Sequence, residues 1–98
     1  MLNHHVLFWL KEDNTQDQKA AFRKGLESLK DIETIRHFHV GTPVPTDRDV
    51  VDSSYTFSLN VVFDDIDGLD SYQIHPLHLA FLDQFRILFD EVVIYDSI

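Results

Sequence analysis

The chain has 98 residues, no cysteine and a formal net charge of −9, and 44% of its residues are apolar, including eight phenylalanines. This length fits one domain, residues 1–98, and the apolar surplus suggests burial against a second copy or around a ligand. The negative charge disfavours nucleic acid and anionic membranes as partners, and the lack of cysteine excludes disulfides and thiolate chemistry. No apolar run approaches the length of a membrane span and no leader is visible, so we expect a cytoplasmic protein.

The first strand is predicted at Asn3–Leu10, where apolar residues occur on both faces. These faces are His4, Val6, Phe8 and Leu10 on one side and His5, Leu7 and Trp9 on the other. A strand that is apolar on both faces is central in its sheet and covered on both sides. After a polar connection, Thr15 and Gln18 form a capping box, and an amphipathic pattern predicts a helix from there to about Leu29.

The rest of the chain supplies three more strands and two helical segments. The strands are predicted at 33–40, 55–63 and 91–96, and an acidic turn at 64–68 caps a short helix, which is followed by a longer one reaching about residue 89. This order is that of the ferredoxin-like βαββαβ fold, an α+β class with an antiparallel four-stranded sheet and both helices on one face. Because the other face lacks a cover, we expect a homodimer paired through the sheets, a dimeric α+β barrel. We take Phe57 and Leu59 to lie on the paired face.

The stretch 71–81 combines an aromatic hydroxyl, two imidazoles and a proline. Pro76 lacks an amide donor and pushes His75 out of helical conformation, so a helix begins here. The apolar positions that follow recur at spacings of three and four, and His78 falls on their stripe. An ionisable ring is thus placed on the buried face of a helix, and Tyr72 can direct its hydroxyl to the same space. The alternative interpretation is a hydrogen-bonded core histidine.

Other histidines offer weaker patterns. His37 and His39 lie two residues apart on one strand face, a spacing that suits a metal, but no third ligand stands at any set spacing from them. We therefore predict no metal site. His4 and His5 point to opposite faces of their strand, so at most one of them lines a pocket.

The pattern Tyr-x-x-His-Pro-x-His at 72–78 resembles the signature of the stress-responsive α/β-barrel (Dabb) family of dimeric proteins. The resemblance extends over the whole chain, through the first strand at 4–8, the segment 50–55, Phe63 with the acidic turn, and 94–96 in the last strand. It implies a ferredoxin-like protomer that pairs through its sheet into a dimeric barrel, in agreement with the pattern of elements.

The family includes plant polyketide cyclases of the olivetolic-acid type, which close a chain by intramolecular aldol condensation. The resemblance implies that His78 is the general base, that Tyr72 assists it and that His5 lines the pocket. We expect the ligand, a small apolar or carbonyl compound, to contact Trp9, Leu7, Phe81, Phe85 and His75 as well. The chain departs from the family in lacking an aromatic partner on the first helix, at 25–27.

Two classes of function remain open at this point. As an enzyme, the protein abstracts a proton next to a carbonyl without metal or other cofactor, because a buried imidazole stays neutral and a tyrosine hydroxyl stabilises the enolate. As a non-enzymatic protein, it is a stress-associated dimer or a ligand-binding module. A further alternative is a cofactor-free or haem-type monooxygenase of the dimeric barrel superfamily.

Overall fold

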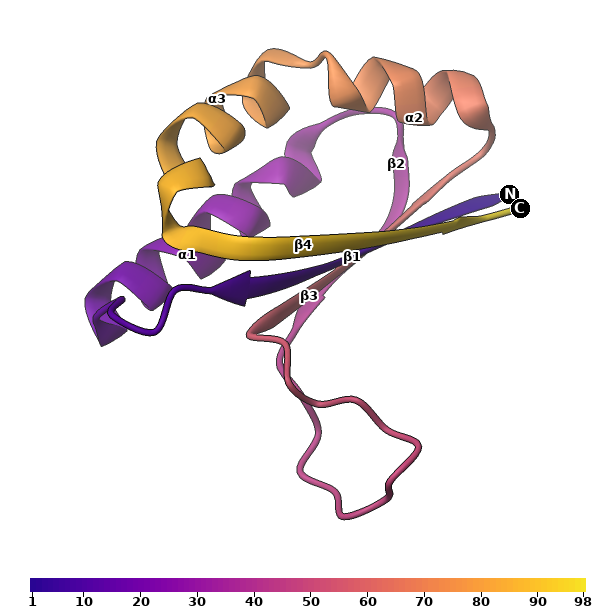
Figure 1. The fold of residues 1–98 in the computed structure, drawn as a ribbon. Coiled ribbons are helices and arrows are strands. Elements are labelled where there is room, and N and C mark those ends of the chain that lie inside the picture. Colours follow the sequence, from indigo (N-terminus) through magenta and orange to yellow (C-terminus); the bar gives the residue numbers. More distant parts are fainter.

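The computed structural model describes residues 1–98 and contains four strands and three α-helices (Figure 1). In chain order these are β1 (Leu2–Leu10), α1 (Gln16–Ser28), β2 (Ile35–Gly41), β3 (Phe57–Phe63), α2 (Ile66–Gln73), α3 (Pro76–Phe85) and β4 (Phe89–Ser97), with short 3-10 turns at Leu29–Asp31 and Arg86–Leu88. The predicted ferredoxin-like order is confirmed, with α2 and α3 together in the position of the second helix. None of the helices is both long enough and apolar enough to cross a membrane.

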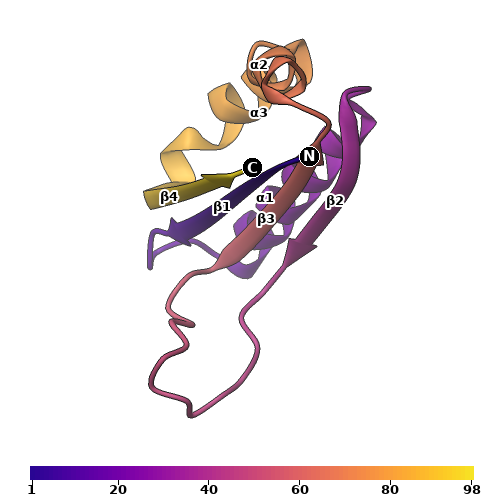
Figure 2. The same cartoon turned by 90° about the vertical axis from the view of Figure 1, so that its right-hand side faces the viewer.

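The four strands form one antiparallel sheet in the order β2-β3-β1-β4, with β1 in the centre. The helices lie on one face of this sheet, and the termini lie close together at one end of β1 and β4 (Figures 1 and 2). The Thr15–Gln18 capping box is present at the start of α1. Since a capping box satisfies two backbone donors that a helix start leaves free, it fixes where α1 begins after the turn from β1.

The hydrophobic core lies between the sheet and the helices. Every second residue of β1 and of β3 points into it. The apolar ones are Leu2, Val6, Phe8, Leu10, Phe57, Leu59, Val61 and Phe63, and His4 is the one polar member. The expectation that Phe57 and Leu59 lie on the uncovered face is therefore wrong, because both are under the helices, at 6% and 2% exposure. Alternation decides which residues share a face, but it does not say which face the helices cover.

The opposite face of the sheet has no cover within the chain. In β1 it presents Asn3, His5, Leu7 and Trp9, all half-buried. The strand register places His39, Asn60, His5 and Tyr95 in one row across all four strands. The side-chain oxygens of Asn3 and Asn60 are buried on this face without a hydrogen-bond partner. This face is thus more polar than the core side, and it includes amide groups that a packed protein normally satisfies.

Strand β2 does not follow the simple alternation that the sequence suggested. A bulge shifts its register between Ile35 and His37, so that Ile35 and Phe38 both pack against the core although they lie three residues apart. His37 and His39 are exposed. No group of three or more histidine or acidic side chains in the protein is arranged to hold a metal ion.

The long loop at 42–56 is attached to the end of β1 by a short hydrogen-bond chain. The indole Nε1–H of Trp9 donates to Ser54 Oγ at 3.0 Å, and Ser54 Oγ donates to Asp52 Oδ1 at 2.6 Å. The hydrogen bonds from the Ser54 side chain and backbone hold the pKa of Asp52 below its usual value. Trp9 therefore positions the loop on the uncovered side of the sheet.

Candidate active site

A cavity of about 170 Å³ lies between the helix-covered face of the sheet and helices α2 and α3. Its 13 lining residues are His4, Val6, Phe8, Leu29, Leu59, Tyr72, Gln73, His78, Phe81, Leu82, Phe89, Val92 and Ile94. Val92 and Ile94 on the edge strand β4 are 41% and 49% exposed, so they stand where the cavity meets solvent. The cavity is apolar apart from two imidazoles, one phenol and one amide.

His78 is positioned by the break between α2 and α3. His75 is the N-cap of α3, its Nδ1 accepts a hydrogen bond from the Leu77 amide at 3.1 Å, and Pro76 follows as the first helical residue. One turn later, His78 Nδ1 lies 3.1 Å from the Gln73 carbonyl oxygen. A carbonyl only accepts, so Nδ1 carries the proton and the neutral ring keeps its lone pair on Nε2.

Burial lowers the pKa of His78 below its ordinary value of 6.5, and the nearby His4 lowers it further, against the opposing effect of the Gln73 hydrogen bond. The charged ring is disfavoured because the cavity replaces water with apolar side chains. His78 is therefore neutral at physiological pH and has a basic nitrogen that is not used within the chain.

Tyr72 lies directly against His78, with ring centroids 4.7 Å apart. Its side chain is 1% exposed and burial alone raises the pKa of its hydroxyl well above 10, without any hydrogen bond from the chain. The phenol consequently stays protonated at all physiological pH values. It is a hydrogen-bond donor available to whatever occupies the cavity.

His4 completes the polar group from the opposite wall. It comes from β1, is 3% exposed, and its ring lies edge-on to Tyr72 at 5.8 Å. Its Nδ1 donates to Asp96 Oδ1 on β4 at 2.6 Å. Asp96 thus fixes the orientation of the His4 ring.

His5, which we expected in this pocket, lies on the other face of the sheet. Its Nε2 is 2.8 Å from Ser58 Oγ, and Leu7 and Trp9 share its face. The structure does not bring these three residues to the cavity, because a step of one residue along a strand reverses the side-chain direction. His4 has the place expected for His5, and it is the residue that alternates in step with Val6 and Phe8.

Of the three other predicted ligand contacts, only one lines the cavity. Phe81 lines the cavity, whereas Phe85 is buried behind it, against α1. His75 does not line the cavity, because its ring caps α3 and its Nε2 faces Glu33 at 3.5 Å. The sequence interpretation missed the contributions of Leu82, Phe89, Val92 and Ile94. Leu82 follows the helical stripe that carries His78, but Phe89 belongs to β4 and not to the helix that was predicted to include it.

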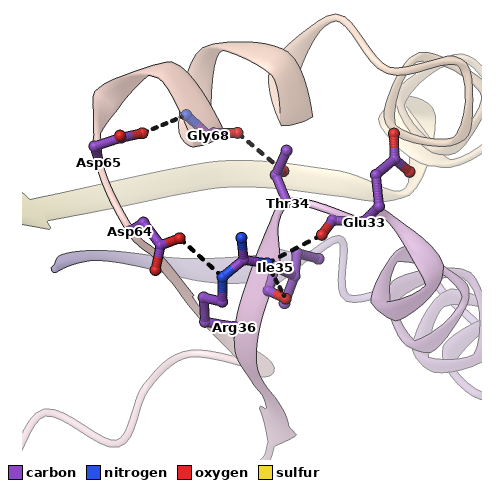
Figure 3. Close-up of polar contacts among 7 residues, drawn as sticks. All are labelled: Glu33, Thr34, Ile35, Arg36, Asp64, Asp65 and Gly68. Atoms are coloured by element: carbon purple, nitrogen blue, oxygen red, sulfur yellow. Dashed lines mark hydrogen bonds and ion pairs between the residues drawn. The ribbon is translucent and has the colours of Figure 1, made fainter.

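A second hollow, of about 260 Å³, is polar and is held together by its own contacts. Arg36 Nε donates to Asp64 Oδ2 at 3.0 Å, Thr34 Oγ1 donates to the Gly68 carbonyl at 3.1 Å, and Asp65 Oδ1 accepts from the Gly68 amide at 3.0 Å (Figure 3). These contacts join β2 to the start of α2, as the predicted capping role of the acidic turn requires.

A family model described as the stress responsive A/B barrel domain, Dabb, matches residues 2–98. The chain belongs to the Dabb family. The family predicted from the histidine–proline element is thereby confirmed over nearly the whole chain.

The Dabb chain is similar to proteins of different organisms. It is 31% identical over 94 residues to a stress-response A/B barrel domain-containing protein of Arabidopsis thaliana, covering 95% of this chain and 81% of that protein. It is 26% identical over 96 residues to olivetolic acid cyclase of Cannabis sativa, covering 97% and 93%. Its fold matches a crystal structure of a dimeric ferredoxin-like protein from Thermobifida fusca with a TM-score of 0.80 at 25% identity, over 98% and 88% of the chains.

Proposed function

We propose that this Dabb protein catalyses cofactor-free proton abstraction from carbon next to a carbonyl group, with His78 as the base. The observation that carries the proposal is the His78 hydrogen bond to Gln73, which leaves Nε2 unprotonated beside the Tyr72 ring. A general base must combine an available lone pair with a pKa that keeps it neutral at the working pH. The lowered pKa of His78 supplies the second condition.

Tyr72 and His4 have complementary roles in this proposal. When His78 removes a proton, negative charge develops on the carbonyl oxygen, and the Tyr72 hydroxyl donates a hydrogen bond to it. A phenol that remains protonated in an apolar cavity is suited to this role. His4, oriented by Asp96, places a second imidazole against the bound molecule. The enolate that forms is the nucleophile that an aldol-type ring closure requires.

The relationship to olivetolic acid cyclase supports this reaction class. A cyclisation of the aldol type begins with removal of a proton next to a carbonyl, which is the step assigned to His78. The polar cavity residues used here come from β1, α2 and α3 of one chain, and β4 of the same chain supplies Asp96, which orients His4. The proposed chemistry therefore needs no residue from a second copy.

We also propose that the protein is a homodimer paired through its uncovered sheet face. That face includes the half-buried Leu7 and Trp9 and the buried oxygens of Asn3 and Asn60 that have no partner in the protomer. A second sheet packed on it would remove apolar surface from water and supply hydrogen bonds to these amides. The similar Thermobifida fusca protein is described as dimeric. In this arrangement, His5 belongs to the interface.

The test is deuterium exchange at the α-carbon of a panel of β-diketones and β-keto esters, followed by NMR with the buffer rate subtracted. We expect His78→Gln to lower the protein-catalysed rate by about 10²–10⁴-fold while the protein stays folded. Tyr72→Phe should lower it with little change in melting temperature, because only the hydroxyl is removed. His5→Gln is the matched control and should exchange as the wild type does. Wild-type exchange no faster than that of His78→Gln would favour a ligand-binding module.

A further inference from the structure

The inner end of the cavity is closed by a cluster of phenylalanines. Phe8, Phe81 and Phe89 line it, and Phe22 of α1, which is fully buried, stands behind all three. The Phe22 ring meets those of Phe8, Phe81 and Phe89 at centroid distances of 5.2, 5.4 and 6.1 Å, each edge-on. Edge-to-face contacts of this kind add to the burial energy of the rings, so the wall is a packed part of the core.

The phenylalanine rings of this wall cannot move toward α1 to enlarge the cavity, because Phe85 fills the space behind them. The Phe85 ring lies 5.7 Å from Phe22 and 5.3 Å from Phe81, and it rests directly on the backbone of Gly25. A Cβ atom at Gly25 would clash with the Phe85 ring. Gly25 is thus the position that lets the ring fit, and the space next to the first helix is filled by protein.

The volume left in front of the wall is small. A cavity of roughly 150 Å³ holds a benzene molecule, so the 170 Å³ here accommodates about seven non-hydrogen atoms. A longer substituent can leave through the mouth beside Val92 and Ile94. The ligand substituent that points into the cavity, however, is limited in length by the Phe81 ring.

The charges around the cavity favour a neutral ligand. None of the 13 lining residues is a lysine or an arginine, and the chain as a whole carries −9. His78 is neutral at physiological pH, and the Nδ1–H of His4 already donates a hydrogen bond to the Asp96 carboxylate. A carboxylate or phosphate entering the cavity would lose its hydration without gaining an unpaired cation, which is costly.

We propose that the cavity selects neutral β-dicarbonyl compounds of about seven non-hydrogen atoms, and that Phe81, held by Phe22 and Phe85, sets the size limit. The proposal rests on the proposed function, since it names the substrate class of the same site. It also separates this protein from an enzyme that encloses a long polyketide chain. The inward substituent is methyl-sized or little larger.

The experiment measures dissociation constants from amide chemical shifts for acetylacetone, dipropionylmethane and dibutyrylmethane. These diketones are symmetrical, so one end must always enter the cavity. Without a size limit, each added methylene would tighten binding by about fourfold through burial alone. We expect the opposite, with dibutyrylmethane bound at least about tenfold more weakly than acetylacetone. Methyl acetoacetate should bind, and the acetoacetate anion should bind at least about tenfold more weakly than its ester.

Two enlarging variants, one in the phenylalanine wall and one elsewhere in the cavity lining, test the size limit. Phe81→Leu and Leu82→Ala should bring the binding of dibutyrylmethane to within about threefold of acetylacetone, with folding checked by circular dichroism. Leu79→Ala, on the exposed side of the same helix, is the control and should leave the series unchanged. Tighter wild-type binding of the longer diketones, equal binding of acetoacetate, or no binding of any member would overturn the proposal. Size-limited binding without α-carbon exchange would refute only the catalytic function, whereas exchange without a size limit would refute only this inference.

Discussion

On the helix-covered face of the sheet, His4 is 3% exposed and donates to Asp96, whereas on the opposite face its neighbour His5 is half-buried and contacts Ser58. The covered face is apolar and encloses the cavity with Tyr72 and His78. The uncovered face mixes apolar side chains with amides that lack partners. This contrast is the reason why we propose catalysis on the covered face and contact with a second chain on the uncovered face.

The largest expected difference between the faces comes from a charge placed on either side of β1. Val6→Glu buries a carboxylate in the core, where Val6 is 5% exposed, and should cost about 4 kcal/mol or more. This is comparable with the whole stability of a small domain, so we expect an unfolded protein by circular dichroism.

Leu7→Glu places the same charge one residue further along, on the uncovered face. We expect this variant to stay folded but to sediment as a monomer under conditions where the wild type sediments as a dimer. A folded Val6→Glu protein, or a Leu7→Glu protein that remains dimeric, would contradict the assignment of the two faces.

The second contrast is between the two adjacent histidines. His4→Ala removes a hydrogen bond to a charged group and should lower the stability by about 1.5–3 kcal/mol. It should also slow α-carbon exchange, because an oriented imidazole is lost from the cavity. His5→Ala should leave the exchange rate unchanged and affect only association of the protomers. Equal exchange rates for the two variants would remove His4 from the site.

The smallest expected effect is a pH dependence of the free energy of unfolding, which arises from His78 on the covered face. Because the folded-state pKa of His78 is below 6.5, the unfolded chain binds a proton more readily than the native protein. The contribution of His78 to stability is therefore present above pH 6.5 and is lost as the pH falls toward its folded-state pKa. As the pH falls from 6.5 to the folded-state pKa of His78, the free energy of unfolding should decrease less for His78→Gln than for the wild type. Urea unfolding at each pH measures this difference. An identical pH dependence in both proteins would show that His78 is not desolvated.

Much of the fold follows from local sequence signals. The Thr15 capping box, the alternation in β1 and the break at Pro76 predicted where elements begin and which residues share a face. Tyr72 and His78 were predicted to share a space because they flank that break, and the structure places their rings in contact. These signals are local, so a sequence alone carries them.

The sequence did not reveal which side of a strand the helices cover. That choice depends on packing between elements, so Phe57 and Leu59 were assigned to the wrong face and His5 was taken for His4. Two adjacent histidines place one ring on each face of the strand, and the family signature does not say which of the two rings faces the cavity. The bulge in β2 was equally hidden, because it depends on pairing with β3.

The most direct test of a neutral imidazole base in the covered cavity is the pH profile of kcat/KM for α-carbon exchange, since this quantity reports the ionisation of the free enzyme. We expect the wild-type rate to rise with pH and to level off at an apparent pKa below 6.5, the ordinary value for histidine. In His78→Gln, this rise should disappear together with about 10²–10⁴-fold of the rate. A wild-type profile that levels off only above 6.5, or one that His78→Gln reproduces, would contradict the assignment of His78 as the base.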